Sequence, residues 1–454
     1  MPSSIYISAA HKSSGKTVVS LGLCAALKQQ PLKVQSFKKG PDYIDPIWLS
    51  QASGNPCYNL DFYNMTNDEI LQLYAQYSSF NDISIIEGNK GLFDGVNVTG
   101  GDANADLAKL LDIPVLLVVD ASGITRGVAP LVSGYQAFDK DLNIAGVILN
   151  KVAGDRHESK LIQAIEHYTD IPIMGSIRRS KDLIIDERHL GLVPANETPE
   201  SKAFIDIAAK QISDQVDLDK IIGINQHSAK QTTPSPSVKD NNLSVAIAKD
   251  SAFGFYYQDD LDKFIQLGVE IKYFNALEDD SLPEADALFI GGGFPEMKLK
   301  ELSVNKSLLA DVRAKIESGM PSYAECGGLM YLSNSITQND NTYSMAGVVD
   351  ADAVMNKKPI GRGYVQLEPT EKHPWNNVSN CIYAHEFHYS KLENLDSNTQ
   401  YVFKVLRGVG VDNMQDGILI HNLVATYTHL RNVAGNQWVE QFVDFIKTTK
   451  DKSS

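Results

Sequence analysis

A cysteine at the end of a short apolar segment is the strongest chemical signal in the sequence. Residues 321–332 read PSYAECGGLMYL, so a strand-like run ends at Cys326, two glycines follow, and a helical pattern begins. A sharp strand-to-helix turn of this kind exposes a nucleophile, and the N-terminus of the helix favours a thiolate. The motif predicts nucleophilic catalysis by Cys326 rather than a buried, inert thiol.

Two further segments supply the groups that a cysteine nucleophile uses. Residues 288–296 (LFIGGGFPE) place three glycines after a strand, and their backbone N–H groups would form half of an oxyanion hole. Residues 425–430 (ATYTHL) leave His429 at the end of a short β-like run. An imidazole there would be the partner base of the thiol. The three segments together predict a cysteine–histidine active site.

A second chemical motif lies near the N-terminus. A strand-like run at 5–8 leads into AAHKSSGKT (residues 9–17) and then into a helical pattern. A P-loop needs a strand, a tight loop whose N–H groups face phosphate, a lysine, a hydroxyl for magnesium and a helix N-terminus. The residues that match the end of this pattern are Gly15, Lys16 and Thr17, and Lys12 adds a positive charge. Although Ala10 replaces the usual first glycine, the context predicts phosphate binding rather than an ordinary strand–helix turn.

Two acidic loops follow later strands of the same half. Residues 36–46 (SFKKGPDYIDP) carry two lysines and two acids in a loop restrained by glycine and proline. The lysines would meet phosphate and the carboxylates Mg²⁺, with a solvated charged turn as the alternative. In 85–95 (IIEGNKGLFDG), Glu87 directly follows a β-like run, where an α/β sheet places its ligands. Glu87 is therefore a candidate Mg²⁺ ligand, and Asp94 is either part of the site or an ordinary turn acid.

The remaining histidine and cysteine signals are weaker. His385 and His388 flank Glu386 in YAHEFHYS, which leaves open a metal site, a substrate or domain contact, or core histidines. The run is not a helical H-E-x-x-H arrangement, and no third ligand is evident. Cys24 and Cys57 stand in no comparable context and are expected to be structural.

The motifs imply two α/β halves that position them. Before residue 227, short β-rich runs alternate with amphipathic stretches, which predicts a parallel sheet covered on both faces. The strands expected there are 4–8, 34–37, 83–87, 115–120, 145–150 and 173–177. A second α/β pattern has expected strands at 243–248, 287–290 and 321–324 and a closing helix at 438–447. Between the halves, HSAKQTTPSPSVKDNN has linker composition. The expected organisation is a domain at 1–226, a linker at 227–242 and a domain at 243–448.

Composition narrows the class of protein. The chain has 454 residues, 43% of them hydrophobic and 21% charged, which is ordinary globular composition. With 41 basic and 56 acidic residues its net charge is −15, which argues against general nucleic-acid binding. It has no apolar run of the roughly 18 residues that a membrane span needs. Four scattered cysteines and the lack of a secretory signal favour a cytoplasmic setting. A homodimer is left open.

Taken in order, the motifs resemble those of the cobyrinate a,c-diamide synthase family. The resemblance rests on GKT, KKGPDYIDP, EGNKGLFDG, VVDASG, AGVILNKV, ERHLGLVPA, GGGFPE, YAECGGLMYL and HEFHYS, spread over almost the whole chain. It implies an N-terminal P-loop domain like that of dethiobiotin synthetase joined to a class I glutamine amidotransferase domain. It also implies ATP-dependent amidation of the a and c acetate carboxylates of a cobyrinate-type corrinoid, with L-glutamine as the nitrogen source.

The resemblance further implies roles for single residues. The implied glutaminase groups are the nucleophile Cys326, its activator His429 and the oxyanion donors Gly293 and Gly327. The implied ATP ligands are Lys12, Ser13, Gly15, Lys16 and Thr17. The implied Mg²⁺ ligands are Thr17, Asp42 and Glu87, and Asp94 would act near the reacting carboxylate. Ordinary class I amidotransferases have a glutamate two residues after the histidine. In this sequence that position is Arg431. The cobyrinate branch also lacks the acid, so the implied catalytic group is a cysteine–histidine dyad.

The implied chemistry is coherent. A carboxylate does not accept ammonia directly because its leaving group would be oxide, whereas ATP can convert it to an acyl phosphate. Ammonia released at Cys326 would then need an enclosed path to the other half. Two alternatives stay open: a relative that amidates hydrogenobyrinate or nickel-sirohydrochlorin, and a non-enzymatic P-loop binding or partitioning protein. The presence of both Cys326 and His429 argues against the second.

Overall fold

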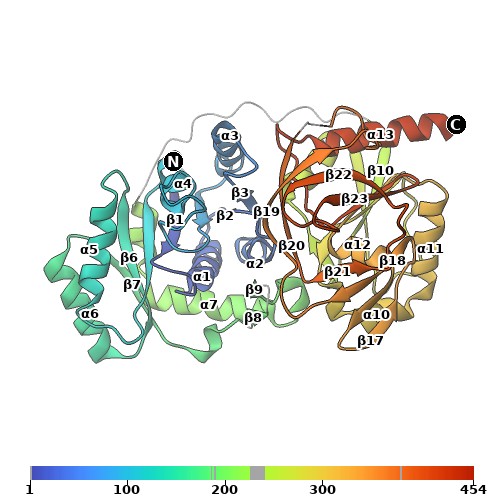
Figure 1. The fold of residues 1–454 in the computed structure, drawn as a ribbon. Helices are drawn as coiled ribbons and strands as arrows, with labels where there is room; N and C mark the ends of the chain where they lie inside the picture. The colour runs from blue at the N-terminus through green and yellow to red at the C-terminus, as the bar shows by residue number, and fades with distance from the viewer. Residues whose placement is uncertain (1–2, 186, 189–190, 225–240, 379–380, 454) are drawn as a thin grey trace. The chain divides into compact units, whose positions relative to one another are not determined.

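The computed structural model describes residues 3–185, 187–188, 191–224, 241–378 and 381–453. The chain divides into two compact units, the first made of Met1–Phe62 and Thr66–Pro234, the second of Tyr63–Met65 and Ser235–Ser454. Figure 1 shows the helices and strands of each unit. Apart from residues 241 and 242, the expected linker lies outside the described residues, and the expected domain boundaries stay a prediction.

The first unit is built on a parallel sheet of seven strands. Its order is β3-β2-β4-β1-β5-β6-β7, and each neighbouring pair is parallel. The strands are β1 (Ser3–Ala9), β2 (Val34–Lys39), β3 (Tyr58–Leu60), β4 (Ile83–Glu87), β5 (Val115–Asp120), β6 (Ile144–Val152) and β7 (Ile173–Arg178). Strands β8 (Glu187–Arg188) and β9 (Gly191–Leu192) form a separate antiparallel pair. Every residue of β1, β2 and β4 is buried, as in strands covered on both faces.

Helices cover both faces of this sheet. They are α1 (Lys16–Gln29), α2 (Ile44–Ser53), α3 (Asn67–Ser78), α4 (Asn104–Leu110), α5 (Val128–Phe138), α6 (Asp155–Tyr168), α7 (Ser201–Gln215) and α8 (Leu218–Gly223), with 3₁₀ turns at Lys181–Leu183 and Ala195–Glu197. Helix α1 packs against α2 and α7, whereas α5 and α6 pack together on the other side of β6 and β7 (Figure 1). Right-handed crossovers put α1 and α4 on opposite faces. The crevice between β1 and β4 is therefore the topological switch point, where an α/β sheet binds its ligand.

The second unit is built on a mixed sheet of nine strands. Its order is β12-β10-β13-β15-β24-β23-β22-β19-β20. The first five strands are mutually parallel and the last four continue the sheet in antiparallel fashion. The strands are β10 (Leu243–Ala248), β12 (Val269–Phe274), β13 (Ala287–Ile290), β15 (Ser322–Glu325), β19 (Gly361–Pro369), β20 (Ile382–His388), β22 (Gln400–Arg407), β23 (Gln415–Ile420) and β24 (Leu423–Thr426).

Smaller elements complete the second unit. A four-stranded sheet has the order β17-β16-β18-β21, and β11 pairs with β14. These strands are β11 (Phe253–Phe255), β14 (Gly292–Gly293), β16 (Ser333–Gln338), β17 (Asn341–Ser344), β18 (Val349–Met355) and β21 (Ser390–Glu393). The helices are α9 (Gln258–Gln266), α10 (Leu299–Val304), α11 (Lys306–Glu317), α12 (Gly327–Leu332) and α13 (Trp438–Ser453), with a 3₁₀ turn at Pro295–Met297.

Two apolar cores hold the nine-stranded sheet. In β13, Leu288 and Ile290 belong to one buried cluster and Phe289 to another. Because alternate residues of a strand point to opposite faces, the two clusters lie on opposite faces of the sheet. Trp438 of α13 packs beside Phe289 in the second cluster, with ring centroids 5.3 Å apart. Strand β15, which leads to Cys326, is therefore held by apolar packing on both faces of the sheet.

The mixed α/β architecture confirms the expected fold class. Each strand expected from the sequence coincides with an observed strand to within two residues at either end, and the closing helix begins at the expected Trp438. The very short strand β3 and the antiparallel half of the second sheet were not predicted individually. Within the described ranges, no helix is both long enough and apolar enough to cross a membrane.

Candidate functional site

The loop after β1 has the geometry of a phosphate-binding loop. Helix α1 begins at Lys16, and Gly15 before it is left-handed, with φ of 92°. A Cβ at Gly15 would lie 2.1 Å from the amide nitrogen of Asn150, so no side chain fits there. The positive end of the 14-residue helix α1 is thereby brought directly to the end of the loop.

Strand β6 fixes the orientation of this loop. The Asn150 amide donates to the carbonyl oxygen of Ser14 at 2.9 Å, and the Lys151 ammonium donates to that of Ser13 at 2.9 Å. Lys151 also lies 2.7 Å from a carboxylate oxygen of Asp120, at the end of β5. In a trans peptide the C=O and the following N–H point in opposite directions. Tying these carbonyls to β6 therefore turns the N–H groups of Ser14 and Gly15 the other way, toward a ligand.

The crevice between β1 and β4 brings together three of the predicted residues. Lys16 is buried and donates to the carbonyl oxygen of Lys90, in the loop after β4. The Thr17 hydroxyl donates to Oε1 of Glu87 at 2.8 Å. Burial and the neighbouring Lys38 ammonium lower the pKa of Lys16 to about 8. The structure thus brings Lys16, Thr17 and Glu87 together in this crevice.

A buried lysine lies among the acids of this site. Lys38 Nζ lies 2.8 Å from Oε1 of Glu87, contacts Asp45 at short range, and lies 3.9 Å from Asp42. Burial acts to lower the pKa of Lys38, but Asp45, Glu87 and Asp42 outweigh it and raise that pKa well above its ordinary value. Lys38 therefore carries the charge that balances these carboxylates in the absence of a ligand.

The other predicted residues of this half have more local contacts. Asp42 accepts the N–H groups of Ile44 and Asp45 at 3.0 and 3.1 Å, so it also caps the start of α2. Asp94 accepts the N–H of Gly91 at 3.0 Å and closes its own turn. Lys12 and Ser13 are exposed on the loop. Contacts between Asp42 or Asp94 and the Thr17–Glu87 pair stay a prediction.

The Thr17–Glu87 pair has the chemistry of a magnesium site. Oε2 of Glu87 is buried and has no hydrogen-bond partner among the residues that the structure describes. A buried carboxylate oxygen without a partner beside a threonine hydroxyl suits a hard cation. In the described part of the chain, no group of three or more His, Cys, Asp or Glu side chains could hold a metal ion by itself. The donor set therefore fits Mg²⁺ bound partly by a nucleotide rather than a protein cage.

Cys326 occupies a strained turn between β15 and α12. Its φ and ψ are 48° and −97°, a conformation that L-residues rarely adopt, and the side chain is buried. The turn is possible because Gly328 has no Cβ, which would lie 2.2 Å from the carbonyl oxygen of Ile290. The Cys326 N–H is fixed by the carbonyl oxygen of Thr426 at 2.7 Å. This is the predicted nucleophile geometry.

The two predicted oxyanion donors lie side by side at this turn. A Cβ at Gly327 would lie 3.2 Å from the backbone nitrogen of Gly293, and one at Gly293 would lie 2.0 Å from the carbonyl oxygen of Ala252. The Gly327 N–H is directed at the Cys326 sulfur, where it acts to lower the pKa of the thiol. Burial, Glu296 and Glu325 outweigh it and raise that pKa. Contrary to the expectation of a thiolate favoured by the helix, the thiol needs a base.

His429 is placed next to this turn by contacts with three residues. Its N–H donates to the carbonyl oxygen of His385 at 2.8 Å, and its ring stacks on that of His385 with centroids 5.0 Å apart. A Cβ at Gly292 would lie 2.5 Å from the His429 ring. Nδ1 of His429 lies 3.3 Å from Oε2 of Glu325, the residue before the nucleophile. The predicted base and nucleophile thus belong to one buried cluster.

The HEFHYS histidines lie in the same cluster. His385 and His388 are both buried on β20, and the carbonyl oxygen of Phe387 between them lies 3.9 Å from the Cys326 sulfur. Burial lowers the pKa of His385 well below its usual value. The ring of His388 stacks on Tyr427 with centroids 4.0 Å apart. Strand β20 thus brings the backbone between the two histidines to the nucleophile, and the His385 ring to that of His429.

Comparison with known proteins identifies both halves of the chain. Residues 6–193 match the CobQ/CobB/MinD/ParA nucleotide binding domain, and residues 244–436 match the CobB/CobQ-like glutamine amidotransferase domain. The chain is 43% identical to the cobyrinate a,c-diamide synthase of Magnetococcus marinus, covering 96% of this chain and 95% of that protein. The chain belongs to the cobyrinate a,c-diamide synthase family. Proteins of the same name from Listeria innocua and Methanosarcina barkeri are 40% and 35% identical, covering 94% and 98% of this chain and 95% and 96% of their own.

Several residues of this family member were not singled out from the sequence. Lys38 and Lys151 were seen only as parts of motifs, and Glu325 only as a letter in the nucleophile motif. An acid on an otherwise apolar strand, directly before the nucleophile, was a signal for Glu325. The contact of Lys38 with Glu87 and that of Lys151 with Ser13 gave no such signal, because these pairs are 49 and 138 residues apart in sequence.

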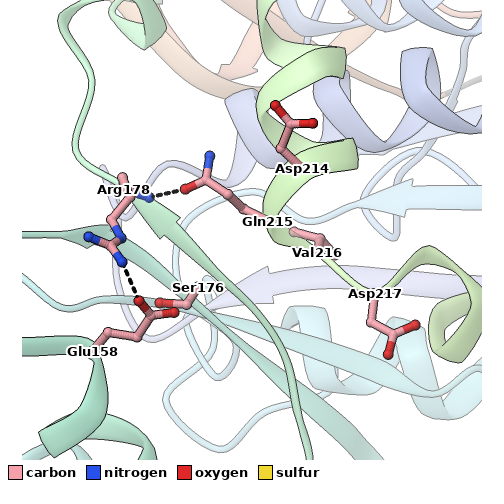
Figure 2. A pocket seen from close by; sticks show the side chains of 7 residues that line it. All are labelled: Glu158, Ser176, Arg178, Asp214, Gln215, Val216 and Asp217. Atoms are coloured by element: carbon pink, nitrogen blue, oxygen red, sulfur yellow. Dashed lines mark hydrogen bonds and ion pairs between the residues drawn. The ribbon is translucent and has the colours of Figure 1, made fainter. Parts of the chain in front are cut away.

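A further pocket of the first unit is lined by none of the predicted residues. Its volume is about 560 Å³, and it is lined by Glu158, Ser176, Arg178, Asp214, Gln215, Val216 and Asp217. Figure 2 shows Arg178 paired with Glu158, while its backbone N–H donates to the Gln215 side chain at 2.8 Å. The three carboxylates outnumber the one guanidinium, which makes the pocket unsuited to phosphate.

Proposed function

We propose that this chain converts the a- and c-carboxylates of cobyrinate to amides, using ATP and glutamine. The observation that carries the proposal is the presence, in one chain, of the Lys16–Thr17–Glu87 site and the Cys326–His429 cluster. The first is a phosphate site and the second an amide-cleaving site. The substrate is the one named for the cobyrinate a,c-diamide synthases that match nearly the whole chain.

In the synthetase half, the carboxylate of the corrinoid attacks the γ-phosphorus of ATP, and ADP leaves. The product is an acyl phosphate, which ammonia then attacks to give the amide and hydrogen phosphate, with the proton lost by the nitrogen ending on the phosphate. Lys16 and the N-terminus of α1 stabilise the charge on the transferring phosphoryl group. Asp94, in the loop that also supplies the Lys90 carbonyl, acts near the acceptor carboxylate.

Magnesium is the metal that this site suits. Thr17 and Glu87 would hold it together with the phosphates of ATP, and Asp42 is the third candidate ligand. Bound there, it would neutralise charge on the β- and γ-phosphates. Lys12 and Ser13, exposed on the loop, would contact the phosphates from the solvent side.

In the glutaminase half, His429 takes the proton of the Cys326 thiol, and the sulfur attacks the side-chain amide of glutamine. The Gly293 and Gly327 N–H groups stabilise the oxyanion. Ammonia leaves with the proton from His429, and water hydrolyses the thioester to release glutamate and restore the thiol. The Cys326 thiol must be reduced, and the two halves together use the ATP and glutamine of the cell. We therefore propose a cytoplasmic setting for the reaction.

The test is a mass-resolved assay of the full chain with Mg²⁺, ATP, glutamine and cobyrinate. The expected result is stepwise conversion to a mono- and then a diamide, with one ADP and one glutamate formed for each amide. Parallel reactions with hydrogenobyrinate and nickel-sirohydrochlorin distinguish the macrocycles. A better rate with either one would overturn cobyrinate as the substrate. Absence of glutamate and amide in all reactions would instead indicate a non-enzymatic nucleotide-binding protein.

A further inference from the structure

We propose that Glu325, the residue directly before the nucleophile, is the positioning residue that orients His429 in the glutaminase site. The cluster then holds a third member, a carboxylate contributed by strand β15 itself. The inference rests on the proposed function only in requiring that glutamine is hydrolysed at Cys326. It does not depend on which macrocycle is amidated.

The geometry of the two side chains carries the proposal. Oε2 of Glu325 lies 3.3 Å from Nδ1 of His429, and both side chains are buried. A carboxylate at Nδ1 holds the imidazole in the tautomer whose Nε2 carries the lone pair that accepts a proton. It also stabilises the imidazolium that forms when the thiol proton is taken. Both effects act on the step that Cys326 cannot make alone, since its environment raises the thiol pKa.

The carboxylate of Glu325 is itself held in place. Its Oε1 accepts the Tyr323 hydroxyl at 2.7 Å and the Leu430 N–H at 2.9 Å. Tyr323 is two residues earlier on the same strand, so its side chain lies on the same face. Leu430 directly follows His429, so one carboxylate fixes both the backbone and the ring of the base segment. A buried polar group with its partners in place is rigid, as an orienting group must be.

The position at which ordinary class I amidotransferases carry a glutamate cannot supply this carboxylate. Arg431 lies there, fully buried, and its guanidinium binds Asp259 with nitrogen–oxygen distances of 3.1 and 3.0 Å. The guanidinium also lies over the ring of Tyr257, 4.7 Å from its centroid. A cation at this position offers no acceptor to an imidazole N–H. Glu325, on strand β15, therefore takes the orienting role that the residue at position 431 cannot have.

A purely structural role for Glu325 is the competing explanation. Its contact with the Leu430 N–H would by itself tie the end of β15 to the segment after β24. Glu325→Gln separates the two roles, because glutamine keeps the volume and an acceptor oxygen but removes the charge. The measurement is glutamine hydrolysis to glutamate by the full chain, with kcat and KM determined separately, and ammonium-supported amidation measured on the same preparation.

The expected result for Glu325→Gln is a kcat for glutamine lower by about 10²- to 10⁴-fold, as when a triad carboxylate is neutralised. KM for glutamine should stay within about threefold, because glutamine binding is not affected. Ammonium-supported amidation should keep its parental rate, because it bypasses Cys326. A parental kcat for glutamine in a folded Glu325→Gln protein overturns the proposal.

Asp416→Asn is the matched control. Asp416 is a fully buried acid that accepts the N–H groups of Tyr427 and Thr428, both at 3.0 Å, just before the base segment. Its exchange should lower the melting temperature while leaving kcat for glutamine within a few-fold of the parent. An equal loss of kcat in Asp416→Asn and Glu325→Gln would identify the effect as structural and overturn the proposal.

Two further measurements cover the case in which Glu325→Gln does not fold. Tyr323→Phe removes only the hydroxyl that fixes Oε1 of Glu325, and it should lower kcat several-fold at constant KM; a parental kcat would contradict the orienting role.

In a double-mutant cycle, Glu325→Asp should lower kcat much less in a His429→Ala background than in the parent, because the two residues act as a unit. Equal costs in both backgrounds would contradict it as well. If the parent itself releases no glutamate, the proposed function fails rather than this inference.

Discussion

Lys38 Nζ lies 2.8 Å from Oε1 of Glu87, the same oxygen that accepts the Thr17 hydroxyl at 2.8 Å. One carboxylate oxygen therefore joins the first turn of α1 to strands β2 and β4 across the nucleotide site. The second oxygen of Glu87 is left for a ligand. Because the ammonium of Lys38 balances the acids of the site, its loss should affect folding as well as chemistry.

Lys38→Met should destabilise the nucleotide-binding unit by about 3–5 kcal/mol, because removing one partner leaves buried charges uncompensated. Asp45 and Glu87 lose the cation that lies between them. The measurement is urea unfolding, following the transition that ATP shifts to higher denaturant. Lys33→Met is the control, since Lys33 is exposed, and it should change the free energy of unfolding by less than about 0.5 kcal/mol. An unchanged transition in Lys38→Met would show that the acids need no such balance.

The local parts of the nucleotide site could be predicted from the sequence, and its long-range contacts could not. Gly15, Lys16 and Thr17 are adjacent residues at a strand–helix junction, so their spacing alone places them at one helix end. Glu87 was predicted because it ends a strand. Lys38 meets Glu87 only because β2 and β4 are neighbours in the sheet, in the register that pairs those two residues. Strand order and register are set by packing across the whole sheet, which a single sequence does not display.

The glutaminase cluster follows the same division. The turn at Cys326 was predicted because strand, glycines and helix are consecutive, and the crowding at Gly328 explains why glycine is needed there. The orientation of His429 depends on Glu325, 104 residues away, through the parallel pairing of β15 with β24. The sequence suggested a dyad because the usual position of the acid holds Arg431. A carboxylate does lie beside the His429 ring, but it belongs to Glu325 on another element.

Cys326→Ala should abolish glutamine-supported amidation and leave ammonium-supported amidation at its parental rate. Loss of the sulfur removes the thioester-forming group, whereas free ammonia reaches the acyl phosphate without it. Both rates are measured by mass on the same preparation. Cys381→Ala, at a partly exposed thiol, is the control and should match the parent with either nitrogen source. Glutamine use by Cys326→Ala would remove this cysteine from the mechanism.

ATP affinity should fall as the pH rises above about 8, because the pKa of Lys16 is lowered to about 8 by burial and by Lys38. Above that pH the free protein must take up a proton to bind the phosphates with a charged lysine. The affinity should therefore fall by up to about tenfold per pH unit. Calorimetric titration at several pH values measures it. Lys16→Arg should lose this dependence because a guanidinium stays charged, and a slope as steep as the parental one would assign it to another group.

The same pKa predicts how stability changes with pH. An unfolded lysine keeps its proton up to pH 10.5, whereas folded Lys16 releases it near pH 8. Between these values the unfolded state binds more protons, so Lys16 makes the ligand-free protein more stable as the pH rises. Urea unfolding at pH 8 and pH 10 should show this contribution as a difference between the parent and Lys16→Met. Equal pH dependence of the two proteins would contradict it.

Exchange of Glu87 for glutamine separates a magnesium ligand from a strand-end acid. Glu87→Gln keeps the shape of the side chain and an acceptor for Thr17 but removes the charge that a hard cation needs. It should raise the Mg²⁺ concentration for half-maximal ATP-dependent amidation and lower the saturated rate by on the order of 100-fold. Asp94→Asn, on the turn after β4, should lower turnover while leaving the magnesium requirement and ATP affinity near parental. Titration of both variants with Mg²⁺, with ammonium as the nitrogen source, gives the comparison. A parental titration curve for Glu87→Gln would show that the unpartnered oxygen of Glu87 does not meet the metal.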